Sequence, residues 1–284
     1  MTWFEAVILG MIQGLTEFLP ISSTAHLKVI PSLLGWKDPG AAFTAVTQWG
    51  TWLATVVYFR HDLLRILAAF FHGLITLRPL ATQEARLAWM IALGTIPIVV
   101  MGVLLKKQIE GSFRSLYVIA AALIGLALLL SLAEWLTKLR QESHHPATEI
   151  ENLGFWQALV IGLAQAVALV PGASRSGSTI TGALFVGLSR SAAARYSFLL
   201  SLPAIFGAGL YQFISSSGRA ELLQTEDSLS SLLIATVVAG IVGYAAIAWL
   251  IAYLRTRSTW GFIFYRLILG LILLWLLQLE LIEP

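Results

Sequence analysis

The chain has 284 residues, of which 58% are hydrophobic and only 12% are charged, whereas charged residues make up about 25% of an ordinary soluble domain. Its net charge of +3 is too small to indicate nucleic-acid binding, and the lack of cysteine excludes disulfides, thiolate catalysis and cysteine-ligated metals. This composition is typical of an integral membrane protein, in which a spanning helix needs about 20 residues. We expect six spans, near residues 41–59, 87–105, 115–136, 191–214, 230–254 and 260–279.

Two further apolar stretches are interrupted in the middle. The first is broken at Pro20, and the second at Pro171 and Gly172. Because proline and glycine interrupt helices, we predict re-entrant helical hairpins over residues 3–34 and 153–188. Irregular backbone at membrane depth is tolerated only where it is buried in protein or lines a wet cavity.

The two interrupted segments also resemble each other. "WFEAVILGMIQG" at 3–14 aligns without gaps with "FWQALVIGLAQA" at 155–166. Three spans follow each hairpin, and this odd number turns the second copy upside down relative to the first. The predicted fold is therefore an all-α integral membrane protein built as an inverted repeat. Its two units are residues 1–140 and 153–284, which share a single membrane domain.

The basic residues predict the orientation of the chain. Ten of the 18 Lys and Arg fall on the side that carries the 60–86 loop, and six fall on the opposite side. Because cytoplasmic loops carry an excess of Lys and Arg, we expect this loop to be cytoplasmic and both termini to face outward. The two hairpin tips would then meet near the midplane, where paired broken segments indicate a binding site.

The tip of the first hairpin contains the stretch "EFLPISSTAH", residues 17–26. Glu17 ends an apolar run, where an ionisable group is costly unless it is paired, hydrated or bound to a metal, and Gln13 shares its helix face. Structural interpretations are also open, because the hydroxyls could cap a helix and the histidine could lie in the core. The concentration of polar groups favours a functional site that combines Glu17 with Ser22, Ser23, Thr24 and His26.

The tip of the second hairpin is "PGASRSGSTITG", residues 171–182. Arg175 is the one charged residue between positions 153 and 188, so it needs an anion. Backbone amides at a helix N-terminus together with an arginine fork form a phosphate-binding arrangement. The structural alternative is an ion pair with Glu17 that only joins the hairpins. Two glycines in this tip, Gly172 and Gly177, allow the backbone to turn and approach a ligand. Hydroxyl groups surround the arginine, and they belong to Ser174, Ser176 and Thr179.

A phosphate site inside a membrane indicates phosphoester or phosphoanhydride chemistry on a lipid. "QGLTEFLPISSTAH" and "PGASRSGST" resemble the two signature motifs of the undecaprenyl-pyrophosphate phosphatase family, also called the bacitracin-resistance family. "TQWGTWLA" at 47–54, which includes Gln48, is similar to a third family segment. The resemblance covers essentially the whole chain.

The resemblance implies a multi-pass enzyme of the bacterial inner membrane whose site opens toward the periplasm. Its expected reaction converts undecaprenyl diphosphate to undecaprenyl phosphate and inorganic phosphate, which recycles the carrier for cell-wall synthesis and confers bacitracin resistance. It also implies a divalent cation, Mg²⁺ or Ca²⁺, with Glu17 as a ligand, since hard cations take oxygen. The family motif has Glu or Gln where this chain has Gln13, so we do not expect a mechanism that needs two carboxylates.

The predicted catalytic residues are Glu17, Ser23, His26 and Arg175. Ser23 is the first choice as nucleophile, activated by His26 or Glu17, while a phosphohistidine at His26 and a water activated by Glu17 are alternatives. The predicted substrate-binding residues are Gln13, Ser22, Thr24, Gln48, Gly172, Ser174, Ser176, Gly177 and Thr179.

A rival hypothesis comes from a different class of protein. Inverted repeats with hairpins at the midplane also build many secondary transporters, so the chain could move a lipid phosphate or a small anion. It could act alone or as a homodimer. Arg266, within the last span, could extend to an interface or pair with an acidic group.

Overall fold

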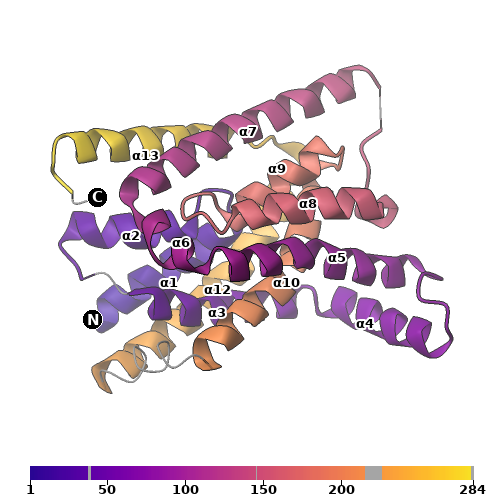
Figure 1. Cartoon of the computed structure of the whole chain (residues 1–284), viewed down its shortest axis with the longest axis horizontal. Coiled ribbons are helices and arrows are strands. Elements are labelled where there is room, and N and C mark those ends of the chain that lie inside the picture. The colour runs from indigo at the N-terminus through magenta and orange to yellow at the C-terminus, as the bar shows by residue number, and fades with distance from the viewer. Residues whose placement is uncertain (38–39, 145, 215–225, 283–284) are drawn as a thin grey trace.

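The computed structural model describes residues 1–37, 40–144, 146–214 and 226–282, and its regular structure there is helical, apart from an isolated bridge between Thr148 and Leu188. Figure 1 shows the long helices lying roughly along one axis. In chain order the helices are α1 (Trp3–Phe18), α2 (Ser23–Leu34), α3 (Gly40–Tyr58), α4 (Arg60–Ile75), α5 (Gln83–Leu104), α6 (Lys106–Glu110), η1 (Ser112–Arg114), α7 (Leu116–Glu142), η2 (Ile150–Asn152), α8 (Phe155–Val167), α9 (Arg175–Phe185), α10 (Arg190–Ile214), α12 (Glu226–Thr256) and α13 (Trp260–Gln278).

Within the described residues, five helices are long and apolar enough to cross a membrane, namely α5, α7, α10, α12 and α13. They coincide with five of the six expected spans. The sixth forms α3, which is not among the five because threonines and a glutamine dilute its apolar residues. The hydroxyls of Thr47 and Thr55 donate to carbonyls one turn earlier, which lets both side chains lie fully buried among helices.

The expectation of a loop over residues 60–86 is wrong for most of its length. Residues 60–75 form α4, which packs along α5. Ile66 is buried there, and the ring of Phe70 lies 5.2 Å from that of Trp89. The apolar residues of this segment recur at helical spacing and bury one face of α4 against α5.

Both interrupted stretches form two helices joined by a turn, α1 with α2 and α8 with α9. In each pair the second helix is capped by a serine with positive φ, Ser22 at 75° and Ser174 at 70°. Each hydroxyl accepts a bond from the amide three residues later. Positive φ is uncommon outside glycine, so this shared conformation is a specific likeness between the two turns.

The helices that enter the two turns pack closely on different long helices. α1 lies against α12, where a Cβ at Gly10 would come 2.5 Å from the carbonyl of Ala235. α8 lies against α5, where a Cβ at Gly162 would come 2.5 Å from the carbonyl of Gly94. Gly10 and Gly162, which align in the sequence, therefore have the same structural role. Each allows its helix to approach a long helix closely, as small residues do in membrane proteins.

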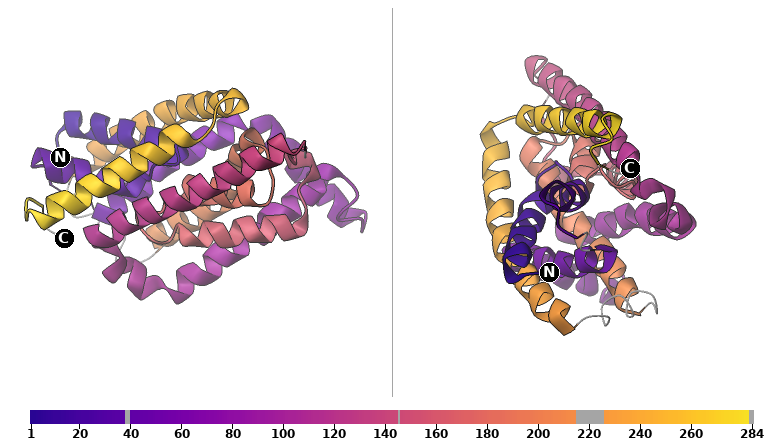
Figure 2. Two further views of the ribbon diagram at one scale, coloured as in Figure 1. Left: turned by 90° about the horizontal axis from the view of Figure 1, so that it is seen from above. Right: turned by 90° about the vertical axis from the view of Figure 1, so that its left-hand side faces the viewer.

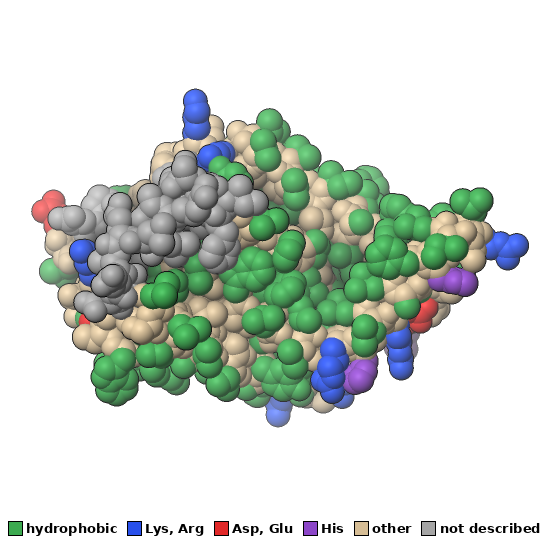
Figure 3. Space-filling view, turned by 90° about the horizontal axis from the view of Figure 1, so that it is seen from below, with side chains coloured by type: hydrophobic (Ala, Val, Ile, Leu, Met, Phe, Trp, Pro, Cys, Tyr) green, Lys and Arg blue, Asp and Glu red, His purple; other side chains and the backbone are tan. Residues whose placement is uncertain are grey.

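The two termini lie at one end of the long axis, and the connection between α4 and α5 lies at the other (Figure 1). Seen along this axis, the first hairpin lies in the middle of the molecule, with α12 to its left and α13 above it (Figure 2, right). On the face shown in Figure 3 the middle is largely hydrophobic, and the charged side chains lie along the margins. This distribution suits a protein whose midsection faces lipid.

Candidate active site

An ion pair joins the tips of the two hairpins. Glu17 lies in the last turn of α1, and its Oε1 pairs with the guanidinium of Arg175, the first residue of α9. Their side chains are 4% and 16% exposed. Two opposite charges that are almost removed from solvent stabilise each other, whereas either one alone would be costly at this depth.

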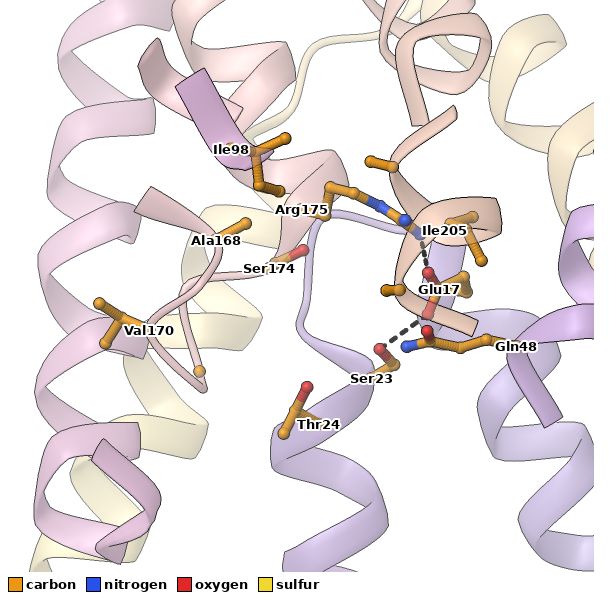
Figure 4. A pocket seen from close by; sticks show the side chains of 13 residues that line it. Glu17, Ser23, Thr24, Gln48, Ile98, Ala168, Val170, Ser174, Arg175 and Ile205 are labelled. Atoms are coloured by element: carbon orange, nitrogen blue, oxygen red, sulfur yellow. Dashed lines mark hydrogen bonds and ion pairs between the residues drawn. The ribbon is translucent and has the colours of Figure 1, made fainter. Parts of the chain in front are cut away.

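The second oxygen of the same carboxylate organises the first hairpin. Glu17 Oε2 accepts a hydrogen bond of 2.8 Å from Gln13 Nε2 and one of 2.9 Å from Ser23 Oγ. Figure 4 shows Ser23 and Arg175 on opposite sides of Glu17. The hydroxyl of Ser23 thus points at a carboxylate that can take its proton.

A cavity of about 150 Å³ lies between the tips (Figure 4). Its polar side carries the carboxylate, the guanidinium, an amide and hydroxyl groups, and its other side is apolar. The polar lining consists of Glu17, Ser23, Thr24, Gln48, Ser174 and Arg175, with Gly172 beside them. The apolar lining consists of Ile98 from α5, Ala168 and Val170 from the second turn, and Ala204, Ile205 and Ala208 from α10.

The second turn is shaped by hydrogen bonds among its own hydroxyls. Ser174 Oγ accepts from the amide of Gly177 at 3.1 Å and lies 3.2 Å from Ser176 Oγ, which donates to the carbonyl of Leu19 in the first turn at 3.0 Å. Gly172 has φ +93°, and a Cβ there would come 2.5 Å from the carbonyl of Ile119. Glycine is therefore required at this position both by conformation and by space.

Thr179 lies outside the cavity lining and is fully buried. Its hydroxyl is 2.5 Å from Ser197 Oγ, and it donates to the carbonyl of Arg175 at 2.8 Å. This threonine thus links α9 to α10 outside the cavity.

His26 is not part of the cavity lining and is 6% exposed. Its Nδ1 is 2.7 Å from the carbonyl of Ser22, so Nδ1 carries the proton and donates it. Its Nε2 is 2.6 Å from the hydroxyl of Tyr265, and the two rings stack with a centroid distance of 5.6 Å. Both ring nitrogens are therefore bonded to protein groups other than Ser23 and Glu17.

Arg266 neither extends to an interface nor has a carboxylate among its partners in the described structure. Its side chain is fully buried, and its hydrogen bonds go to backbone carbonyls of both turns and of α7. Both sequence-based alternatives for this residue are therefore wrong, because carbonyls supply the acceptors that a partner acid would otherwise provide.

The oxygen atoms beside Glu17 fit a hard divalent cation. In the described residues, no three His, Asp or Glu side chains gather into a metal-binding group. Gln13 Oε1 is buried and has no hydrogen-bond partner among the described residues, while Nε2 of the same side chain donates to Glu17. One carboxylate and one free amide oxygen suit Mg²⁺, which is commonly held by one or two carboxylates together with substrate phosphates.

The structure brings seven predicted site residues to the cavity and leaves the others around it. Those outside the lining are Gln13, Ser22, His26, Ser176, Gly177 and Thr179. Sequence reasoning missed the apolar wall and Tyr265. The small residues of "LPAIFGAG" at 202–209 hint at close approach on α10, but which of their faces meets the cavity depends on packing.

This fold and cavity define a multi-pass membrane protein with a charged cavity between two helical hairpins. A family model described as bacitracin resistance protein BacA matches residues 6–272. The chain belongs to this family.

Several similar proteins carry the name undecaprenyl-diphosphatase. The one from Chlorobium phaeobacteroides strain BS1 is 57% identical over 270 residues, which cover 95% of both chains. The one from Chloroherpeton thalassium is 53% identical over 279 residues, 98% of both chains. The one from Chlorobium chlorochromatii is 55% identical over 284 residues and matches both chains in full.

Proposed function

We propose that this chain is an undecaprenyl-diphosphatase, which hydrolyses undecaprenyl diphosphate to undecaprenyl phosphate and inorganic phosphate. The observation that carries the proposal is the Ser23 hydroxyl bonded to a carboxylate that also pairs with Arg175, inside a membrane-embedded cavity. The names of relatives that match 95% or more of the chain support the substrate and the reaction. Recycling of the lipid carrier and bacitracin resistance follow from the same family membership.

Arg175 binds the terminal phosphoryl group. Its guanidinium projects into the cavity beside Ser174 and the start of α9, where backbone amides and the helix dipole favour an anion. A diphosphate competes with Glu17 for the guanidinium, so substrate binding opens the ion pair. The carboxylate then no longer pairs with Arg175 and keeps its hydrogen bond from Ser23.

Ser23 attacks the terminal phosphorus, and Glu17 accepts the hydroxyl proton. The bond from that phosphorus to the bridging oxygen breaks, undecaprenyl phosphate leaves with the bridging oxygen, and the phosphoryl group is carried by Ser23. Glu17 passes this proton to the leaving bridging oxygen, which frees the carboxylate to act as a base again. Water then attacks the phosphoserine, Glu17 takes a proton from that water, and the proton returns to Ser23 Oγ as inorganic phosphate leaves. The positions of both His26 nitrogens support Glu17 rather than His26 as the base.

A divalent cation, Mg²⁺ or Ca²⁺, belongs to the proposal as well. Glu17, which lines the cavity, would hold it together with oxygens of the diphosphate. When bound, it supplies positive charge that offsets the charge on the phosphate oxygens.

The proposed architecture is an inverted repeat with re-entrant hairpins over residues 3–34 and 153–188, within units 1–140 and 153–284. The shared serine caps and the equivalent glycine contacts of α1 and α8 support it. We propose that the protein lies in the bacterial inner membrane, with the cavity open toward the periplasm. That the chain forms a homodimer remains a prediction.

The rival function is transport of a lipid phosphate or a small anion. Detergent separates the two, because no gradient exists across a micelle and a transporter would leave undecaprenyl diphosphate intact. The test is release of inorganic phosphate from undecaprenyl diphosphate by the purified chain with Mg²⁺ or Ca²⁺. Phosphate release by the unmodified chain that is lost in Ser23→Ala supports the enzyme. If the folded, unmodified chain leaves the lipid intact, the proposed enzyme function is refuted.

A further inference from the structure

Arg266 is a buried cation in the middle of α13, and every hydrogen bond described for it goes to a backbone carbonyl. Its Nη1 donates to Pro20 at 3.2 Å, and its Nη2 donates to Gly172 at 3.1 Å and to Ala173 at 3.2 Å. Its Nε donates to Leu123 of α7 at 3.2 Å. A single guanidinium thus binds the first turn, the second turn and a spanning helix.

The backbone carbonyls of the two turns require a side-chain hydrogen-bond donor. Pro20, Gly172 and Ala173 lie between helices, and in the described part of the chain no backbone amide bonds to their carbonyls. In a membrane an unsatisfied carbonyl is costly, and Arg266 removes this cost at both turns at once. Because its donors form a rigid planar fork, the guanidinium also fixes the distance between the turns.

This distance sets the geometry of the reacting groups. Pro20 is three residues from both Glu17 and Ser23, and Ala173 is two residues before Arg175. The ion pair between Glu17 and Arg175 also joins the tips, but in the proposed reaction it opens when the diphosphate binds. Arg266 lies outside the cavity lining, so its bonds persist when that pair opens.

The neighbouring residue on α13 strengthens the same anchorage. The Tyr265 hydroxyl lies 2.6 Å from His26 Nε2, and His26 in turn donates to the carbonyl of Ser22. Two adjacent residues of α13 therefore hold the first turn on both sides of Ile21, and one of them also holds the second turn.

We propose that Arg266 is a positioning residue for the hydrolysis: it holds the two hairpin tips at the separation at which Ser23 and Glu17 face Arg175. The inference rests on the proposed function for its effect on catalysis. Its structural part, that Arg266 sets the separation of the hairpins, stands independently of the substrate.

The test compares Arg266→Met and Arg266→Lys with a matched control, Arg140→Met. Arg140 also donates to two carbonyls, those of Leu184 and Phe185 at 2.7 Å, but at the opposite end of α9. The chain has no cysteine, so spin labels can be placed at Met11→Cys on α1 and Leu163→Cys on α8, which are 42% and 53% exposed. Their distance distribution reports the hairpin separation, and phosphate release from undecaprenyl diphosphate reports kcat and KM.

For Arg266→Met we expect a shifted or broadened label distance and a fall in kcat of about 100-fold, with a much smaller change in KM. For Arg266→Lys we expect a kcat and a label distance between those of Arg266→Met and the unmodified chain. Arg140→Met should keep kcat within about twofold of normal and leave the label distance unchanged. If Arg266→Met does not fold, Arg266→Lys decides by the same two readouts.

An unchanged distance with normal kcat in the Arg266 variants would overturn the inference, and so would an equal loss of kcat in Arg140→Met. If the unmodified chain releases no phosphate, the proposed function fails. The label distances then still decide whether Arg266 sets the separation of the hairpins.

Discussion

Ser23 Oγ lies 2.9 Å from Glu17 Oε2, the carboxylate oxygen that does not pair with Arg175. The carboxylate therefore holds the hydroxyl with one oxygen and the cation with the other. This arrangement joins the proposed nucleophile, base and phosphate ligand, and it brings together Glu17 and Arg175, which are 158 residues apart in the chain. The following predictions depend on it.

Arg175→Lys should reduce phosphate release by about 100-fold or more, because an ammonium keeps the charge but loses the planar fork that binds two phosphate oxygens. The measurement is kcat/KM on undecaprenyl diphosphate. Arg195→Lys is the control, since Arg195 pairs with Asp62 and Glu151 away from the cavity. Normal turnover in a folded Arg175→Lys protein would contradict the phosphate-binding role.

His26 and Glu17 should respond differently to substitutions that preserve shape. In His26→Asn the side-chain amide can still donate to the Ser22 carbonyl, so the variant should keep more than about a tenth of the activity of the unmodified chain. Glu17→Gln removes the charge and the base, and should lose about 100-fold or more. The reverse order would show that His26 is the base.

The proposed orientation predicts which ends of the molecule an impermeant thiol reagent reaches in intact cells. A cysteine at Leu33, at the end of α2, should be labelled from outside, and a cysteine at Ile75, at the end of α4, should not. Both positions are exposed, at 55% and 81%, so accessibility alone does not distinguish them. Labelling of Ile75→Cys but not of Leu33→Cys would show that the orientation is the reverse of the proposed one and that the cavity opens toward the cytoplasm.

Gly162→Ala should lower the stability of the protein by about 1 to 3 kcal/mol through overpacking, because its Cβ would come 2.5 Å from the Gly94 carbonyl. Gly125→Ala in α7 is the matched control, since nothing lies within 4 Å of its added Cβ. The control should be neutral or gain up to about 1 kcal/mol from helix propensity. Thermal unfolding in detergent measures both, and equal stability of the two variants would argue against the close contact of α8 with α5.

The sequence predicted the turns and the charged residues of the site because the signals are local. Pro20 and Gly172 interrupt helices wherever they lie, and a charge in an apolar stretch, such as Glu17 or Arg175, needs a partner. The pairing of these two charges was open as a structural alternative, and the structure contains it.

The features that sequence analysis missed depend on packing between distant segments. Arg266 binds carbonyls, which every residue carries, so no residue type marks its partners. The alanines of α10 line the cavity only because the second turn packs beside that helix. α4 lies in the segment predicted as a loop between two expected spans, and it forms a helix that packs along α5.

The central claim is that Ser23 is the nucleophile in a lipid diphosphatase. Its most direct test is phosphate release from undecaprenyl diphosphate by Ser23→Ala, beside Ser22→Ala and Thr24→Ala, with binding of the lipid and thermal unfolding measured for each variant. We expect Ser23→Ala to lose about 1,000-fold or more in kcat while it keeps its fold and still binds the lipid. Ser22→Ala, which loses a helix cap, should cost about 1 kcal/mol of stability and little kcat. Similar, small losses of kcat in all three variants would contradict the account.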